Sequence, residues 1–203
     1  MKYNKIIIDT NDLYARAFGI ESKNTDITSK EVLNKTVQNC VKQILSLKSK
    51  YLETGGVVYV LADNPTSKKV VRKNLDPNYK ANRIKESDGY YRGIDFVLLL
   101  LSKYSEDFYT ARIKTYEADD LIKPIIDSLT STETVLLVSA DMDWARGMNE
   151  NIHWLSKSGL YDQESFKERY KFYPNDKTVT LYKVFQGDTS DNIPAISGIN
   201  EQT

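Results

Sequence analysis

Acidic residues recur along this chain at the points where short apolar runs end. Asp9 follows Ile6–Ile8, Asp63 follows the run from Val57 to Ala62, and Asp141 follows a third such run. Continuous apolar runs of this length are typical of strands buried on both faces of a parallel sheet. Because the C-terminal ends of parallel strands share one edge, where open α/β sheets keep their sites, we expect these carboxylates to converge.

Further acids complete the series in three short groups. They are Glu117, Asp119 and Asp120, then Asp143 beside Asp141, then Asp188 and Asp191 within Gly187-Asp188-Thr189-Ser190-Asp191-Asn192. Each acid alone has an ordinary explanation as a helix N-terminal, N-cap or turn residue. Carboxylates that converge, however, repel one another unless they are protonated or neutralised by a cation. The complete series therefore predicts a metal site.

The residue types favour a hard cation. Mg²⁺ and Mn²⁺ select carboxylate and water oxygens. Cys40 is the only cysteine and His153 has no metal-ligand spacing, so zinc is disfavoured, and both side chains are expected to be structural. Two ions roughly 4 Å apart could clamp the attacking and leaving oxygens of a phosphodiester, with a metal-bound water as nucleophile.

Local spacing refines the helix that begins after Glu117. Glu117 and Asp120 are three apart and share one face of the helix start, whereas Asp119 would approach the metal through the looser first turn. Asp141 and Asp143 are two apart just beyond a strand, so both can point the same way. We expect all of them to be ligands.

The pattern of apolar residues predicts an α/β fold. Strands are expected at about 5–9, 57–63, 107–113 and 134–140, separated by helices at Lys30–Leu52, Ile94–Tyr104 and Ala118–Leu129, with further helices at about 164–172 and 178–186. Such alternation builds a parallel sheet with helices on both faces. At 203 residues, one main domain is the default. No apolar run is long enough for a signal peptide or a membrane span, so we expect a cytoplasmic monomer that makes no membrane contact.

One segment departs from this alternation and carries a local positive charge. Basic and acidic residues each number 28 in the whole chain, but between Lys68 and Arg92 there are eight basic residues against three acidic ones. Asn64-Pro65, Asp76-Pro77 and Gly89 punctuate the segment, which is expected to stand away from the core. A basic segment facing an acidic cluster indicates a nucleic-acid partner.

Several motifs resemble those of a known family and follow its order. They are Ile8-Asp9 with Tyr14-Ala15-Arg16, Arg72 with Asp76-Pro77-Asn78-Tyr79-Lys80-Ala81-Asn82-Arg83, Tyr116-Glu117-Ala118-Asp119-Asp120, Ser139-Ala140-Asp141-Met142-Asp143, and Gly187-Asp188-Thr189-Ser190-Asp191-Asn192-Ile193-Pro194. The family is the 5′ nucleases, which comprise flap endonucleases and the 5′-to-3′ exonuclease domain of bacterial DNA polymerase I, with bacteriophage relatives. The resemblance covers almost the whole chain.

The resemblance implies a PIN-like parallel-sheet nuclease core at residues 1–186, with a basic helical arch at about 64–95. Residues 187–203 would start a helix-hairpin-helix (helix-three-turn-helix) unit. It further implies two Mg²⁺ ions, replaceable by Mn²⁺, and cleavage near a free 5′ end of DNA or RNA–DNA. Flap, nicked or single-stranded 5′ ends would be the partners, as in primer or flap removal during DNA replication in a bacterium or phage-infected host.

The resemblance also assigns residues to the substrate. Lys80 and Arg83 would contact the scissile region as catalytic groups, and Tyr90 and Tyr91 could stack on bases. The further expected nucleic-acid contacts are Arg16, Arg72, Tyr79 and Arg92.

Two departures affect the last motif. Ala195 stands where the family usually has glycine, and Asn200 replaces a glycine of the duplex-gripping turn. Because such turns hold phosphates through backbone amides, we expect an incomplete clamp and weak duplex binding.

Three alternatives remain open. A PIN-type ribonuclease would share the acids but usually lacks the basic arch and the Gly187–Asn192 motif. A non-cleaving module that binds branched nucleic acid would be expected to have lost one or more of the acids. A dehalogenase-like phosphatase could use Asp9, but it would need an aspartate where Asn11 stands.

Overall fold

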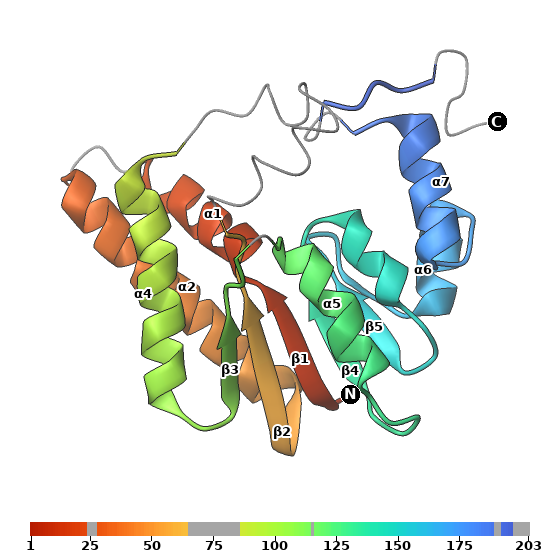
Figure 1. Ribbon diagram of the computed structural model, residues 1–203, viewed down its shortest axis with the longest axis horizontal. Coiled ribbons are helices and arrows are strands. Elements are labelled where there is room, and N and C mark those ends of the chain that lie inside the picture. The colour runs from red at the N-terminus through yellow and green to blue at the C-terminus, as the bar shows by residue number, and fades with distance from the viewer. Residues whose placement is uncertain (24–27, 65–85, 115, 189–191, 197–203) are drawn as a thin grey trace.

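The sheet has the order β3-β2-β1-β4-β5-β6, and all pairs except β5–β6 are parallel. The computed structural model describes residues 1–23, 28–64, 86–114, 116–188 and 192–196 (Figure 1). The strands are β1 (Tyr3–Asp9), β2 (Leu52–Leu61), β3 (Phe108–Ala111), β4 (Val135–Val138), β5 (Ile152–Leu155) and β6 (Leu160–Tyr161). The expected α/β sheet is thus confirmed. Strand order reverses between β1 and β4, which is where such sheets form a crevice.

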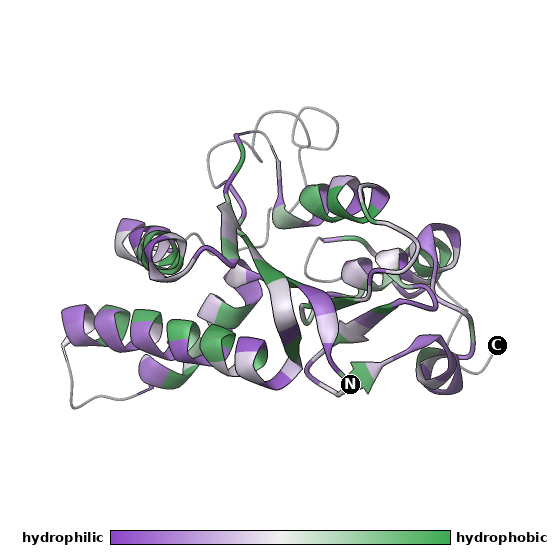
Figure 2. Cartoon of the chain, turned by 90° about the horizontal axis from the view of Figure 1, so that it is seen from below, coloured by the Kyte–Doolittle hydropathy of each residue, from purple (hydrophilic) through white to green (hydrophobic). Residues whose placement is uncertain are grey.

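Helices cover both faces because side chains of successive strand residues point in opposite directions. Ile6 and Ile8 pack with α1 (Thr10–Glu21), α2 (Ser29–Tyr51) and α4 (Asp88–Tyr104). Ile7 packs on the other side with α5 (Ala118–Asp127), η1 (Met142–Gly147), α6 (Gln163–Tyr170) and α7 (Asp176–Gln186). In Figure 2 the central strands carry much of the hydrophobic colour and the helices show both hydrophobic and hydrophilic turns. The burial on two sides explains why Ile6–Ile8 of β1 and all of β4 are apolar.

Elements α1, η1, β5 and β6 lie outside the predicted pattern, and β5 and α1 show why. Strand β5 is short and interrupted by His153, but Ile152 and Trp154 are buried. Helix α1 begins with the polar residues Thr10, Asn11 and Asp12, so it carries only a weak apolar stripe. Both elements are stabilised by contacts with neighbours rather than by a strong local pattern.

Helix α4 begins earlier than expected. It begins at Asp88, not at Ile94, because the Ser87 side chain accepts a hydrogen bond from the Tyr90 amide and caps the helix. Tyr90 is 7% exposed and packs edge-on against Tyr14 at 4.9 Å between ring centroids. Residues 88–95 therefore form the first turns of α4, and the arch stays a prediction because residues 65–85 lie outside the described part.

Cys40 and His153 both have structural contacts, as expected. Cys40 is buried in the α2 face, and His153 Nδ1 lies 2.9 Å from the hydroxyl of Tyr3. No helix in the described ranges is both long and apolar enough to cross a membrane.

Candidate metal centre

Asp9 lies at the end of β1 and is tied to the end of β4. Its Oδ1 accepts a hydrogen bond from the Asp12 amide at 3.1 Å, which caps α1, and its Oδ2 accepts one from Ser139 Oγ at 2.9 Å. Ser139 in turn accepts a hydrogen bond from the Asp141 amide at 3.1 Å. The ends of the two central strands are thereby held together at the crevice.

Three carboxylates meet beside this link. Oxygens of Asp119, Asp141 and Asp143 all lie within 4.8 Å of one another. Asp141 caps η1 by accepting a hydrogen bond from the Asp143 amide at 2.9 Å, and Trp144 Nε1 donates to Asp119 Oδ1 at 2.7 Å. The tight η1 turn therefore orients Asp141 and Asp143, and the indole of Trp144 in the same turn orients Asp119. The expected convergence of Asp119, Asp141 and Asp143 is observed.

Asp63, Glu117 and Asp120 take supporting positions around the trio. Asp63 lies two residues beyond the end of β2 rather than at its last residue, and its Oδ1 accepts from the Ala118 amide at 2.9 Å. Glu117 is the N-cap of α5, and its amide donates to Asp120 Oδ2 at 2.9 Å. Glu117 and Asp120 therefore lie together at the helix start, as expected, and form a capping box there. Their role as ligands stays a prediction.

The electrostatics of the cluster favour a cation. Burial, with the charges of Asp63 and Asp119, raises the pKa of Asp9 to about 8. Burial, with the charges of Asp141 and Asp63, raises the pKa of Asp119 to about 7. Asp143 Oδ1 is buried, and Arg146 Nε lies 3.5 Å from it as an ion pair without a hydrogen bond. Crowded carboxylate oxygens with raised pKa values, without soft ligands, fit a hard divalent ion.

Helix α7 adds one basic residue that sequence reasoning missed. Lys183 Nζ lies 2.7 Å from Asp188 Oδ2, 2.8 Å from Asp143 Oδ2 and 3.3 Å from Asp141 Oδ1. Burial alone would lower the pKa of Lys183, but the charge of Asp141 and hydrogen bonds to Asp143 and Asp188 raise it. Its position five residues before Asp188, near the end of a predicted helix, was the available signal. Asp191 lies outside the described residues.

The expected nucleic-acid contacts have mixed outcomes. Arg16 pairs with Asp12 at 2.9 Å, and Asp12 accepts from the Ala140 amide, so Arg16 lies beside the crevice. Tyr90 is buried, which contradicts its role as a stacking platform; Tyr91 is partly buried and Arg92 is exposed. The remaining predicted contacts lie outside the described residues: Arg72, Tyr79, Lys80 and Arg83.

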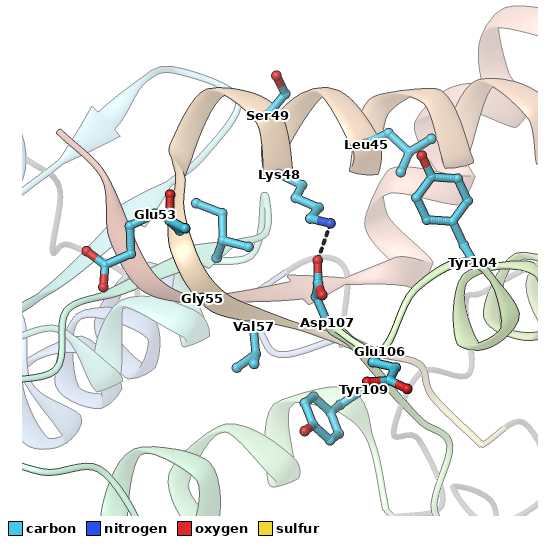
Figure 3. A pocket seen from close by; sticks show the side chains of 13 residues that line it. Leu45, Lys48, Ser49, Glu53, Gly55, Val57, Tyr104, Glu106, Asp107 and Tyr109 are labelled. Atoms are coloured by element: carbon cyan, nitrogen blue, oxygen red, sulfur yellow. Dashed lines mark hydrogen bonds and ion pairs between the residues drawn. The ribbon is translucent and has the colours of Figure 1, made fainter.

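An open pocket occupies the opposite end of the sheet. It lies where α2 ends and β2 begins, and Lys48 and Asp107 form an ion pair in it (Figure 3). Glu53 and Glu106 also line it. Within the described chain, the trio of Asp119, Asp141 and Asp143 is the acidic group compact enough to hold a metal, so the pocket is not a second such centre.

Comparisons with known proteins identify a family and agree with the fold. Residues 4–171 match the family model of the 5′-3′ exonuclease N-terminal resolvase-like domain. The chain is 30% identical to DNA polymerase I of Caldicellulosiruptor bescii. The match covers 98% of this chain and 23% of that protein. It is 28% identical to a 5′-3′ exonuclease of Buchnera aphidicola subsp. Schizaphis graminum, over 100% of this chain and 70% of that protein.

Solved structures show the same fold. The bacteriophage T5 5′-exonuclease with bound divalent zinc ions superposes with a TM-score of 0.74 at 23% identity, covering 98% of this chain and 71% of that one. The bacteriophage T5 flap endonuclease in complex with DNA and metal ions gives a TM-score of 0.73 at 22% identity, with the same coverage. Since the family model spans most of the chain and the acids occupy the sheet edge, this protein belongs to the 5′-3′ exonuclease N-terminal domain family.

Proposed function

We propose that this protein is a divalent-metal-dependent, structure-selective 5′ nuclease that hydrolyses phosphodiesters near free 5′ ends of DNA or RNA–DNA. The observation that carries the proposal is the meeting of Asp119, Asp141 and Asp143 oxygens within 4.8 Å at the sheet edge. A family member with this trio has the ligands for metal-assisted hydrolysis and needs no serine, cysteine or histidine nucleophile.

The donor set fits two Mg²⁺ ions, for which Mn²⁺ should substitute. Asp119, Asp141 and Asp143 would hold the ions directly, and further acids of the series would complete the centre: Asp9, Asp63, Glu117, Asp120, Asp188 and Asp191. Bound ions of this kind activate water and neutralise charge on the phosphodiester. Zinc bound to the T5 exonuclease and metal ions bound to the T5 flap endonuclease support divalent-ion binding in this fold.

The protein's own residues would fix the ligands and attract the substrate. Trp144 and Ser139 hold the orientation of Asp119 and Asp9 through hydrogen bonds, which limits rearrangement when ions bind. Lys80 and Arg83 of the basic segment would orient the scissile phosphate, while Lys68 and Lys69 would supply diffuse attraction. The charge of the segment and its place after β2, whose C-terminal end lies on the same sheet edge as Asp9, support a role in substrate binding. The division between the two pairs rests on the resemblance of the Asp76–Arg83 motif to that of the family.

The substrate proposal rests on the family and on the DNA complex of the T5 enzyme. Flap, nicked and single-stranded 5′ ends are the proposed partners, and we propose that the protein acts as a monomer. A PIN-type ribonuclease is disfavoured by the basic segment and by Gly187–Asn192. In this proposal both features serve to bind a branched or single-stranded DNA substrate.

The test is cleavage of 5′-labelled flap, nicked, overhang and RNA-primed duplexes, beside a structured RNA, with Mg²⁺ or with EDTA. We expect Mg²⁺-dependent products from the 5′ ends of DNA substrates and none in EDTA. Cleavage in excess chelator would overturn the metal mechanism. Cleavage of the RNA alone would replace the proposed substrate by that of a ribonuclease.

The basic segment has its own test. Lys80→Ala should lower the single-turnover rate by about 10²-fold at saturating substrate, because it removes charge stabilisation at the reacting phosphate. Lys69→Ala should mainly weaken binding and reduce the salt slope by about one. Equal, binding-only effects at the two positions would contradict a catalytic role for Lys80.

A further inference from the structure

Lys183 makes an unusual set of contacts for a lysine of this protein. Its ammonium reaches carboxylates at the start of η1 and just beyond α7: Asp141 at 3.3 Å, Asp143 at 2.8 Å and Asp188 at 2.7 Å. Its side chain is 16% exposed. Across the described ranges, the other lysine ion pairs each join a single carboxylate. Lys183 is therefore placed to act on the metal centre itself.

We propose that Lys183 is the resident counter-ion of the metal centre, which stabilises the ion-free site and competes with divalent ions for Asp141 and Asp143. This inference rests on the proposed metal-dependent function. It assigns Lys183 a positioning role that regulates ion binding, in addition to any contact with substrate.

The competition follows from shared ligands. Asp141 and Asp143 are two of the three residues whose oxygens lie within 4.8 Å of one another, and both already contact the ammonium. Asp119, the third, is held by the Trp144 indole instead. A divalent ion bound by the trio would share two of its carboxylates with a positive charge, and like charges at short range repel. The lysine has a flexible stem, so it can give way as ions enter.

The way Asp188 is held determines whether loss of Lys183 tightens or weakens ion binding. Its amide donates to Ile193 O at 2.8 Å and its carbonyl accepts from the Ile193 amide at 2.8 Å. Gly187, at φ +73°, turns the chain so closely that an added Cβ would lie 2.4 Å from the Ala195 amide. The backbone therefore holds Asp188 in place without the lysine. Loss of the ammonium should remove repulsion toward the ion without dispersing the ligands.

The experiment is a Mn²⁺ titration of the purified 203-residue chain, followed by electron paramagnetic resonance and calorimetry. We expect Lys183→Met to bind Mn²⁺ about tenfold more tightly than wild type, the size of one screened unit charge acting on a divalent ion. Lys183→Arg keeps the charge and should stay near wild type. Lys123→Met is the matched control, because Lys123 pairs with Asp127 on the exposed side of α5.

A second readout uses the ion-free protein. In EDTA, Lys183→Met should melt at a lower temperature than wild type because the carboxylates lose their counter-ion, and Mn²⁺ should raise its melting temperature more. Circular dichroism checks the fold, and Lys183→Gln replaces the methionine variant if that one does not fold.

The outcomes separate the inference from the proposed function. If wild type binds Mn²⁺ and Lys183→Met binds it equally or more weakly, the competing role of Lys183 is wrong although the metal centre stands. If wild type binds no Mn²⁺, the metal centre itself is wrong and the inference goes with it.

Discussion

At the N-terminal ends of the strands, Asp107 and Glu133 each carry a lysine partner, Lys48 and Lys5 respectively. At the C-terminal ends, Asp9 and Asp119 are instead crowded by further carboxylates. The pKa values respond in opposite directions. Hydrogen bonds from Lys48 and Ser105 lower the pKa of Asp107, whereas burial and neighbouring charge raise those of Asp9 and Asp119.

The difference distinguishes acids that stabilise the fold from acids held ready for a ligand. A paired surface carboxylate is neutralised within the protein and contributes little either way. A buried, unneutralised group lowers the stability of the ion-free fold, and such groups cluster at functional sites. Charged pairs that support the fold thus lie at the N-terminal ends of the strands, and the proposed metal centre lies at their C-terminal ends.

The largest expected effect is on cleavage activity, which should depend on acids at the C-terminal ends of the strands and not on those at the N-terminal ends. Asp143→Asn should lower Mg²⁺-dependent cleavage by about 10²-fold or more, because it removes a ligand charge where the transition state needs it. Asp107→Asn, the matched change at the other end, should leave the rate unchanged. Single-turnover cleavage of a 5′-labelled flap measures both. Full activity of purified Asp143→Asn would remove this residue from the proposed metal set.

The second prediction concerns pH in chelator. The folded pKa values of Asp9 and Asp119, about 8 and 7, exceed the ordinary value of 3.8, so the folded state binds more protons between these limits. The ion-free protein should therefore lose stability as pH rises from about 4 to 8. The loss should be at most about 1.4 kcal/mol per group for each pH unit crossed, because each group then binds at most one proton more in the folded state.

Asp9→Asn tests this sign directly. In EDTA it should unfold at higher urea than wild type at pH 8, and the advantage should shrink toward pH 4, where Asp9 of the folded wild type is protonated and no longer carries a buried charge. Chemical denaturation at a series of pH values measures it. A constant difference across the range would mean that Asp9 affects stability through packing rather than charge.

The third prediction is stabilisation by the ion. Mg²⁺ at about 100 times its dissociation constant should add about 2.7 kcal/mol to the free energy of unfolding, since ions bind the folded site alone. The gain should vanish in Asp143→Asn and persist in Asp107→Asn. Thermal melts with and without Mg²⁺ measure it, and equal gains in both variants would place the ion elsewhere.

The smallest effect belongs to the far end of the sheet. Lys48→Met should change the free energy of unfolding by about 1 kcal/mol or less, because the Lys48–Asp107 pair is partly exposed. High salt should reduce even this difference. Urea denaturation at low and high salt measures it. A loss several times larger would show that the pocket's ion pair is a major part of the fold's stability.

The sequence by itself determined the central strands and the acids that follow them. Ile6–Ile8 and Val135–Val138 are apolar at every position because both of their faces are buried, so the type and approximate place of these strands could be predicted from local pattern. Parallel pairing by itself places Asp9 and the later acids on one edge of the sheet.

Only the tertiary structure decided which charged and aromatic groups meet. Tyr90 is buried because Gly93, one turn later, leaves room for Tyr14 to approach: an added Cβ would lie 1.8 Å from the Tyr14 hydroxyl. Asp120 caps α5 beside the trio, and Lys183 enters the acidic cluster because α7 packs on η1. Local sequence records periodicity and capping preference, but contacts between distant segments depend on how whole helices pack on the sheet.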